Sequence, residues 1–588
     1  MLILLVYVDK TVYLRTSCLT MDSTQTHFLR PLFAIASLFL FSQAWAQECN
    51  CPELGNRPVV NLTDNDGAGT GTRTLSCDSL YVLNGFVYVN SGDVLTVDPG
   101  TVIQAKPGQG ENASCLVVAR GGQILADGTS ECPIVFTYEG DPMNGSTPYS
   151  THGLWGGVVI NGYGALNTYD GEDNAEGIMD ASGQFRDVFG GADNAESSGV
   201  LRYISIRHGG SEMPNPPVNF QNVINGDETN GLSLNGVGSG TTLEHLEIVS
   251  TLDDGLQVMG GAASIKYLAI AFSTEENIEY DLGWVGDVQY FFSLMDQGEM
   301  TGEHGFDFEG DDFEFQDVTL SFLPYTNPQI ANFTSFGHEG IGAVRWHNGG
   351  GGRLYNGIFQ NWDFGIDFED ADPCDAYELF LFGQLEIHNN RFWNVGDSLA
   401  LDTMVLYEGP VWNGNDQIQD HFVLNNNQGS DLGLDDTFDA LAGFITSGVD
   451  PFPTVTDSVP AQHQPVGTFF DPVNYVGAFE PGGENWLTGS YLDELGVFYP
   501  GDIPGCMYDW ACNYSESANL DDGSCDILSC AGCTYEAAEN FDPAAVRDDG
   551  TCAGFDGNSE CPTDVDQDGT VGVNDLLEIL SVFGSSCE

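Results

Sequence analysis

The chain has 588 residues, with 87 acidic against 15 basic residues and a formal net charge of −72. Such a surface repels nucleic acid and anionic lipid head groups, so neither is expected as a partner. The same charge opposes compaction unless cations screen it. Two interpretations stay open, a saline habitat and carboxylates that bind calcium.

Residues 1–46 are predicted to be an export signal that is removed from the mature chain. Arg30 precedes an apolar run from Leu32 to Phe41, and Ala44-Trp45-Ala46 places small residues at the two positions that set cleavage. The composition ahead of Met21 is atypical, which suggests that Met21 is the true start. The apolar run is too short to span a bilayer, so no membrane span is expected. The predicted location is extracellular, either secreted or at the cell surface.

Cysteine usage agrees with export. The chain has 15 cysteines, of which only Cys18 lies in or before the signal, and this leaves an even number for disulfides. Residues 47–80 are expected to form an N-terminal cap of the following domain. The expected disulfide partners are Cys49, Cys51 and Cys77 in the cap, and Cys115 with Cys132 in an early coil.

A repeat of 22 residues organises the central part of the chain, predicted as residues 81–500. Leu243–Ser264 aligns without a gap with Ile265–Gly286. A fixed period in this range indicates a solenoid, in which each repeat buries its apolar face only against its neighbours. Stacked turns lie about 4.8 Å apart, so equivalent side chains form ladders. The residues predicted to be buried in these ladders include Leu246, Ile248, Leu268 and Ile270.

Two solenoids fit this period. A leucine-rich repeat would continue with Asn or Cys and then a helix. Here a second alternating run, Leu256 and Val258, is ended by Gly260-Gly261. Two or three short strands per turn, with Gly and Asp at the corners, describe a parallel β-helix instead.

Further segments share the spacing of this repeat. Leu201, Ile204 and Ile206 repeat the first apolar run. The apolar residues that begin at Ile366 lie 110 residues, or five periods, beyond those that begin at Leu256. The phase is lost around residues 295–312 and 324–352, which are predicted to be loops. An aromatic segment, Asn474–Ser490, is expected to cap the C-terminal edge of the solenoid.

These features resemble the pectin-lyase-like, right-handed parallel β-helix proteins of secreted bacterial origin. The resemblance covers roughly Tyr81 to Pro500. It depends on the repeat and on short strings, Leu154-Trp155-Gly156-Gly157, Ser205-Ile206-Arg207-His208-Gly209-Gly210 and Asp253-Asp254-Gly255. It implies an all-β fold and a role with polysaccharides, which some members of the group cleave.

The candidate catalytic residues are four acids at equivalent positions of two adjacent repeats, Asp253, Asp254, Glu275 and Glu276. In-register stacking would place like residues about 5 Å apart, near the carboxylate spacing of a retaining glycosidase and also suited to calcium. Solvated corner residues are the third interpretation. Basic partners are sought among Arg202, Arg207, His208 and His245.

Catalysis is the less favoured interpretation. Lyases that act on uronates need a cationic site, whereas the whole chain has three lysines, Lys10, Lys106 and Lys266. The acidic field would repel a polyanion. No zinc spacing of the H-E-x-x-H kind occurs, since His338-Glu339 and His347 lack it.

Residues 505–556 contain two cysteine-rich repeats at a spacing of 27. Gly505-Cys506 returns as Gly532-Cys533, and Asp521-Asp522-Gly523 returns as Asp548-Asp549-Gly550. Too few apolar residues are present for a core, so disulfides are expected to replace it. The Asp-Asp-Gly-x-Cys ending resembles calcium-dependent thrombospondin type 3 repeats. A disulfide-stapled spacer is the alternative.

Residues 561–588 contain a twelve-residue EF-type calcium loop followed by a short helix. Carboxylates occupy positions 1, 3, 5 and 12, and a glycine takes the sharp turn at position 6. Asp at position 12 followed by a Leu-Leu helix resembles one half of a type I dockerin, and the usual second half is missing. Cys561 and Cys587 bracket the module. The predicted Ca²⁺ ligands are Asp564, Asp566, Asp568, Asp575 and the carbonyl of Thr570.

The sequence therefore predicts a secreted, calcium-stabilised β-helix protein that works in adhesion or glycan binding. Its partners would be a polysaccharide or cell-surface glycan, together with a cohesin-like or other surface anchor for the C-terminal modules. The alternative is a polysaccharide-degrading enzyme, a lyase or glycoside hydrolase, with a dockerin-like tag.

Overall fold

A computed structural model describes the chain in two units, Met1–Tyr499 and Pro500–Glu588. The predicted signal, Cys49 and Cys51 lie outside the described residues. Among the described residues, no helix is both long enough and apolar enough to cross a membrane. The structure describes residues 54–581 except 179, 181, 213–227, 296–301, 303, 311–322, 339, 370–375, 397–404, 409–419, 422–423, 435–437, 442, 455–459, 462, 499–503, 509–510, 516–519, 522, 527–528, 537, 546, 549, 554–564 and 566–570.

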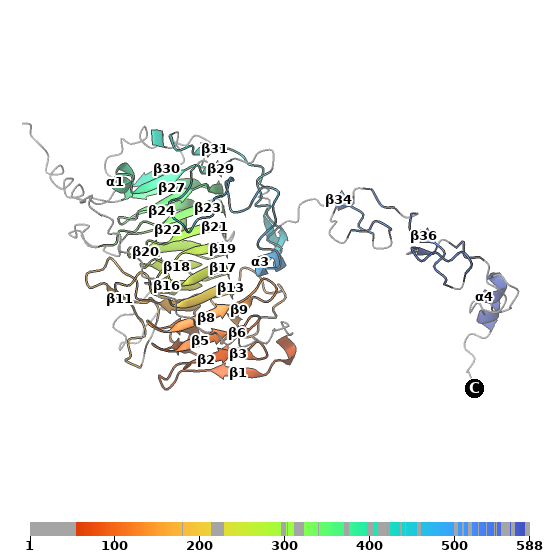
Figure 1. Cartoon of the computed structure of the whole chain (residues 1–588), viewed down its shortest axis with the longest axis horizontal. Helices are drawn as coiled ribbons and strands as arrows, with labels where there is room; N and C mark the ends of the chain where they lie inside the picture. The colour runs from red at the N-terminus through yellow and green to blue at the C-terminus, as the bar shows by residue number, and fades with distance from the viewer. Residues whose placement is uncertain are drawn as a thin grey trace, which may run out of the picture. The chain divides into compact units, whose positions relative to one another are not determined.

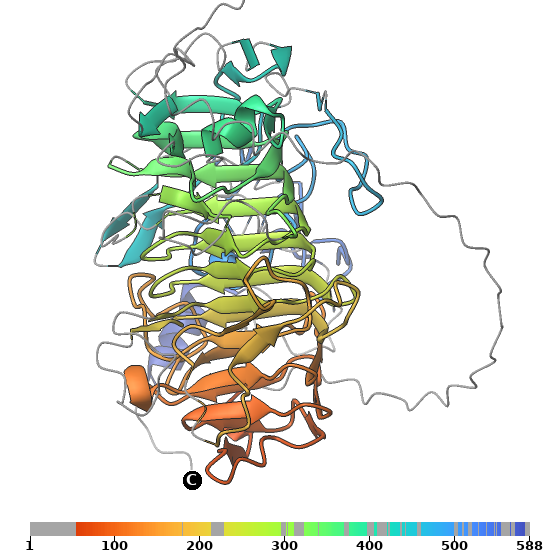
Figure 2. The same cartoon turned by 90° about the vertical axis from the view of Figure 1, so that its left-hand side faces the viewer.

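The first unit is a stack of short parallel strands, as Figures 1 and 2 show. One sheet, called sheet B, has ten strands within the described residues, and each pairs in parallel with the next. Its strands in ladder order are β4 Phe86–Val89, β7 Cys115–Val118, β10 Val158–Asn161, β16 Leu232–Asn235, β18 Leu256–Met259, β20 Ile278–Asp281, β22 His304–Phe308, β24 Gly342–Trp346, β27 Phe364–Glu369 and β30 Val405–Glu408.

The second sheet, sheet A, begins as two parallel ladders that merge at β13, Gly199–Arg207, which pairs with one strand of each. One ladder is β1 Val59–Leu62, β3 Leu80–Leu83, β6 Val102–Ala105 and β9 Ile134–Tyr138, and the other is β2 Arg73–Leu75, β5 Val94–Val97 and β8 Gln123–Asp127. Beyond β13 lie β17 Thr242–Val249, β19 Ile265–Ala271, β21 Asp287–Leu294, β23 Gln329–Phe336, β25 Gly352–Tyr355, β26 Ile358–Trp362, β28 Leu385–His388, β29 Arg391–Val395 and β31 Gln428–Gly429.

Short elements decorate this stack. Single turns of 3-10 helix are η2 Leu54–Asn56 and η3 Gly110–Asn112, and a helix, α1 Ala376–Leu381, precedes β28. The antiparallel hairpins are β11 Glu172–Asn174 with β12 Val188–Gly190, β14 Ser211–Glu212 with β15 Glu228–Thr229, and β32 Asp439–Leu441 with β33 Phe444–Ser447.

The predicted parallel β-helix and its register are confirmed. β17 and β19 pair so that Leu246 faces Leu268 and Ile248 faces Ile270, and all four side chains are buried. β18 and β20 pair at the same offset of 22 residues. The expectation that Ile366 lies five turns beyond Leu256 was wrong, because it lies four turns beyond. The two turns that reach β22 and β24 are longer, and their extra residues together equal one period.

Strands also precede Tyr81, the predicted start of the β-helix. β1 pairs in register with β3, and β2 pairs with β5, so sheet A includes part of the segment predicted as a cap. The 22-residue repeat did not predict these strands, because β1 has four residues and β2 has three, and both lie between polar turns.

Buried residues of sheet B form ladders, and one of them changes from aliphatic to aromatic side chains along the stack. One ladder runs from Leu234 and Val258 through Tyr280 and Phe308 to Trp346, each at most 1% exposed. The rings of Tyr280 and Phe308 stack with centroids 4.1 Å apart. Because stacked turns are a fixed distance apart, larger side chains must be accommodated by a wider turn rather than by wider spacing.

Sheet A bends at a corner where each turn holds one residue in the left-handed conformation. In β13, β17, β19 and β21 these are aromatic or imidazole side chains, whose rings stack with centroids 4.3, 4.3 and 4.7 Å apart. In later turns the position is Asn, which tolerates positive φ best after Gly. The corner residues are Tyr203, His245, Tyr267, Tyr290, Asn332, Asn356, Asn389 and Asn426.

The segment from Pro460 to Phe498 lies along this corner and the outer face of sheet A. Corner amides donate to its backbone, with Asn332 Nδ2 2.9 Å from Tyr475 O and Asn356 Nδ2 2.7 Å from His463 O. The apolar residues of the segment, including helix α3 Tyr491–Glu494, pack on outward residues such as Phe292. The predicted cap Asn474–Ser490 therefore covers the side of the β-helix and not its end, because sheet A is apolar on both faces here.

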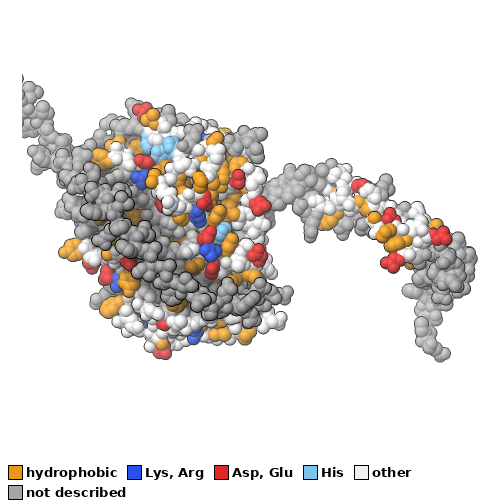
Figure 3. All heavy atoms as spheres, in the orientation of Figure 1, with side chains coloured by type: hydrophobic (Ala, Val, Ile, Leu, Met, Phe, Trp, Pro, Cys, Tyr) orange, Lys and Arg blue, Asp and Glu red, His pale blue; other side chains and the backbone are white. Residues whose placement is uncertain are grey.

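Next to the corner, basic and acidic residues alternate from one strand to the next. Arg202 Nε lies 2.9 Å from Glu244 Oε2, and its Nη1 lies 2.7 Å from Asp127 Oδ1. The next strand places Lys266 beside Glu244, and Lys266 Nζ reaches Asp471 of the covering segment at 2.9 Å. Figure 3 shows basic and acidic side chains in contact on this face. The scarce basic residues thus serve as local neutralisers of the acidic surface.

The predicted Cys115–Cys132 disulfide was wrong. Cys115 is a free, buried thiol in β7 of sheet B, where Sγ lies 3.2 Å from Gly157 O. Cys132 and Cys77 are both disulfide-bonded. Cys132 lies at a turn beside β6 and β9 of sheet A, whose ladders are separate from that of Cys115. Disulfides of this kind are typical of an oxidising, extracellular compartment.

The described part of the second unit contains two disulfide-linked repeats and one helix. The bonds Cys506–Cys525 and Cys533–Cys552 occupy equivalent positions, and Cys512–Cys530 adds a third in the first repeat. Each repeat has a two-residue parallel pairing, β34 Pro504–Gly505 with β35 Leu520–Asp521 and β36 Ala531–Gly532 with β37 Arg547–Asp548. The helix is α4 Val573–Ser581.

Replacing Leu268 by Asp tests the ladder directly. The side chain is fully buried between Leu246 and Phe291, so we expect a loss of more than about 3 kcal/mol from an unpaired buried charge and lost packing. The measurement is the urea midpoint in calcium-containing buffer. Leu125→Asp is the control, since Leu125 is 36% exposed on β8. Equal midpoints for the two variants would contradict the assigned register.

Asp287 of β21 gives a pH-dependent test. Burial raises the pKa of Asp287 to about 6, although hydrogen bonds from Gln329 oppose this. The folded chain therefore holds this proton more tightly than the unfolded chain. The free energy of unfolding should fall as pH rises from about 4 to about 6.

The variant Asp287→Asn should remove this fall in the free energy of unfolding with rising pH. We expect a gain of about 1–3 kcal/mol at pH 8 and little change at pH 4, measured by urea unfolding. Glu139→Gln, at an exposed position, is the control. A gain that is equal at both pH values would show that burial of the carboxylate is not the cause.

Candidate functional site

Seven carboxyl groups gather on the outer face of sheet B around β18 and β20. The four predicted acids lie in the turns that lead into these strands, and the structure brings them together. Glu279 of β20 and two acids from hairpins join them. The set, here called the acidic cluster, is Glu176, Glu228, Asp253, Asp254, Glu275, Glu276 and Glu279.

Asp254 and Glu276 form part of a staircase between turns. Asp254 N donates to Asn230 Oδ1 at 3.1 Å, and Glu276 N donates to Asp254 Oδ1 at 2.9 Å. One turn further, His304 N lies 3.4 Å from Glu276 Oε1. The glycine that follows Asp254 is required by packing, since a Cβ on Gly255 would lie 2.2 Å from Ile270 Cγ2. These two acids therefore satisfy the backbone of the next turn.

Asp253 and Glu275 lie close to Glu228 instead of joining the staircase. One carboxylate oxygen from each of Glu228, Asp253 and Glu275 lies within 4.8 Å of the others. Asp253 has φ +63°, and this left-handed turn directs it away from the staircase. Burial, then the charges of Glu228 and Glu275, raise the pKa of Asp253 well above its usual value. Three converging carboxylates suit a hard cation such as Ca²⁺.

Asp254 and Glu279 form a hydrogen-bonded carboxyl pair. Burial, then the charge of Glu279, raise the pKa of Asp254 well above its usual value. Burial also raises the pKa of Glu279, although the hydrogen bond from Asp254 opposes the rise. Gln257 Nε2, one turn away, donates to Glu279 Oε2 at 3.3 Å and to Glu176 Oε2 at 2.7 Å. Each carboxyl group of the pair therefore holds its proton to a higher pH than an isolated carboxyl group does.

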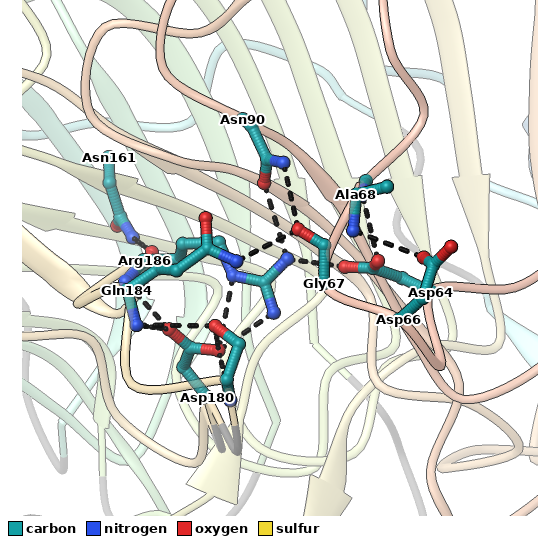
Figure 4. A network of polar contacts seen from close by, with 11 residues as sticks. Asp64, Asp66, Gly67, Ala68, Asn90, Asn161, Asp180, Gln184 and Arg186 are labelled. Carbon is teal, nitrogen blue, oxygen red and sulfur yellow. Dashed lines mark hydrogen bonds and ion pairs between the residues drawn. The ribbon is translucent and has the colours of Figure 1, made fainter.

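Glu176 reaches the cluster on the β11–β12 hairpin, which the Arg186 network holds against the stack (Figure 4). The Arg186 guanidinium contacts Asp64, and its Nη2 lies 2.7 Å from Asp180 Oδ1. It lies over the Tyr88 ring at 3.7 Å, and Asn161 Nδ2 of β10 donates to Arg186 O at 3.0 Å. A buried cation with two carboxylates and a ring fixes the loop to the N-terminal turns.

The basic residues sought near the cluster lie elsewhere. Arg202 and His245 belong to the corner of sheet A already described. The Arg207 guanidinium lies 3.8 Å from the Tyr491 ring, and His208 Nε2 lies 3.0 Å from Tyr491 Oη. All four are thus engaged on the other sheet. Strands of sheets A and B alternate along the chain, so closeness in sequence did not mean the same face.

The predicted calcium loop is described only in part. Asp564, Asp566, Asp568 and Thr570 lie outside the described residues. Asp575 is 2% exposed, and its two oxygens accept from Val565 N at 2.7 Å and Gly572 N at 2.6 Å. The position-12 carboxylate therefore faces into the loop at the start of α4.

Sequence reasoning missed three members of the cluster. Glu279 lies one period beyond Gln257, so the 22-residue alignment held a signal for it. Glu176 and Glu228 come from hairpins outside the repeat, and only folding brings them to β18.

Comparison with known proteins concerns the first unit. A family model described as a pectate-lyase like beta helix domain matches residues 67–438, more than half of the chain. No curated protein and no solved structure matched the chain. The stacked parallel strands and this match together show that the chain belongs to the pectate-lyase-like β-helix domain family.

Proposed function

We propose that this protein binds a polysaccharide outside the cell, on the outer face of sheet B at the acidic cluster. The observation that carries the proposal is the gathering of seven carboxyl groups on one rigid face of a fold that is found in carbohydrate-active proteins. The disulfides support an extracellular site of action.

The chemistry of the cluster favours a hydroxyl-rich glycan without charge. Carboxylates accept hydrogen bonds from sugar hydroxyls. Calcium at Glu228, Asp253 and Glu275 would leave coordination positions for two neighbouring hydroxyls, because it takes six to eight oxygen ligands. The net charge of −72 opposes the approach of a uronate polymer.

Polysaccharide cleavage is the second candidate, and the Asp254–Glu279 pair favours it. A carboxyl group with a raised pKa is what a general acid in glycoside hydrolysis needs. Against this stands the staircase hydrogen bond that Asp254 accepts from Glu276 N, which assigns the residue a structural role.

A panel of neutral and acidic polysaccharides separates these outcomes. We expect the full chain to retain a neutral glycan in calcium and to release it in chelator, with no new reducing ends or unsaturated sugars. Asp253→Asn with Glu275→Gln should weaken retention about 10-fold or more, because the calcium ligands lose their charge. Glu139→Gln, an exposed acid away from the cluster, is the control.

Two results would contradict the proposal. Retention of glycan that is equal in both variants would remove the acidic cluster from binding. Appearance of reducing ends that Asp254→Asn abolishes would make the protein an enzyme.

We further propose that the C-terminal modules display the β-helix on a surface through a cohesin-like or other anchor partner. Helix α4 supports this with exposed apolar side chains, including Val573 at 73%, Leu577 at 58% and Leu576 at 56%. In the part of the chain that the structure describes, the disulfide-linked repeats before α4 bury few apolar side chains, as expected for a spacer.

Calcium titration of the full chain tests the EF-type loop. Asp564→Ala with Asp575→Ala should lower the bound calcium by one equivalent, because the loop then loses its first and last carboxylates. Magnesium should substitute poorly, since its octahedral shell keeps its waters. Glu139→Gln, at an exposed position outside every proposed calcium site, is the control. An unchanged stoichiometry in the double variant would contradict the site.

A further inference from the structure

A second group of metal-ligating atoms lies on the next two turns of sheet B, directly beside the acidic cluster. Asp307 lies in β22, Glu309 follows it, and His347 follows β24. β22 and β24 pair in register, and this ladder continues with His347 N donating to Phe308 O at 3.1 Å. The register therefore places Glu309 and His347 side by side, with Asp307 two residues back on the same face.

Three ligand atoms converge there. His347 Nε2 lies 2.8 Å from Asp307 Oδ1 and 2.9 Å from Glu309 Oε1, and all three atoms are within 4.8 Å of one another. The side chains are 8%, 15% and 20% exposed for His347, Asp307 and Glu309. Asp307 Oδ1 is buried and makes no hydrogen bond of normal geometry within the described part of the chain.

The other oxygen of each carboxylate has a polar neighbour, as a hydrogen-bond donor for Glu309 and a more distant guanidinium for Asp307. Asn348 Nδ2 donates to Glu309 Oε2 at 3.0 Å, and Arg345 Nη1 lies 4.0 Å from Asp307 Oδ2. Such outer contacts orient the remaining oxygens toward the third ligand, as they do around protein metal sites. Below the group, Phe308 and Trp346 are fully buried and hold both strands rigidly.

We propose that Asp307, Glu309 and His347 bind a divalent metal of borderline softness, for which zinc is the best fit. An imidazole nitrogen with two carboxylates suits zinc, whereas calcium and magnesium take oxygen ligands. Two carboxylates with a neutral imidazole carry the charge that one divalent ion neutralises. Ligand atoms about 2.1 Å from a tetrahedral zinc lie about 3.4 Å apart, so His347 Nε2 needs to move only about 0.5 Å further from each carboxylate oxygen. Asp307 pairs in register with Glu279 of the acidic cluster, but the metal proposal is argued from its own three ligands and does not rest on glycan binding.

Zinc titration of the full chain in excess calcium, against a chromophoric chelator, tests the site. Calcium occupies the oxygen-only sites and leaves the mixed one. We expect one zinc equivalent at micromolar concentration, and His347→Gln should weaken its binding by about 100-fold or more. His245→Gln, in the ring stack of sheet A, is the control and should bind as the wild type does.

Cobalt provides a second measurement that reports the ligands. Co²⁺ at the site should give visible absorption bands, and these should disappear in His347→Gln and change in Asp307→Asn. Near-UV circular dichroism checks that each variant is folded. If the folded wild type binds no zinc, or if His347→Gln retains its zinc and cobalt spectra, the three residues are an ion pair only and the proposal fails.

Discussion

Parallel pairing of every turn with the next is the constraint on which the structure depends. Backbone hydrogen bonds hold successive turns at one spacing, so each buried side chain must fit against its counterparts above and below. The ladder from Leu234 to Trp346 shows the consequence, since its members lie in register and the rings of Tyr280 and Phe308 stack on each other. The large differences in length between turns lie in the loops, where an insertion costs little.

The same constraint creates function-bearing surfaces. Because equivalent positions align along the stack, a single acidic position in a repeat becomes a row of acids. In the staircase through Asp254 and Glu276, that row satisfies the backbone of the next turn. Asp253, turned by its positive φ, instead meets Glu228 and Glu275. Two adjacent acids of one motif thus have different roles.

The corner of sheet A shows how the stack recruits a cover. A left-handed residue in each turn bends the strand, and stacked rings or amides occupy the position. The side-chain amides of Asn332, Asn356 and Asn389 donate to the backbone of the segment from Pro460 to Phe498. With phenylalanines on the outer face, this corner binds a long segment that has little regular structure of its own.

The sequence by itself determined the repeat, the strand register around Leu246 and Leu268, and the four acids at the turns. These features follow from the alternation of apolar and polar residues and from a fixed period, both of which can be read from the sequence. It also determined the equivalent disulfide-linked repeats, because their cysteines recur at one spacing.

Only the tertiary structure decided which acids meet. Glu176 and Glu228 reach the acidic cluster from hairpins. Arg207 and His208 contact Tyr491 beside sheet A, away from the cluster on sheet B. The segment Asn474–Ser490 covers the side of the β-helix instead of its end. Asp307, Glu309 and His347 converge across a turn whose length breaks the period, so no spacing rule could join them. The physical reason is common to all of these contacts. Each depends on how turns of unequal length stack in space, and a one-dimensional period carries no information about that.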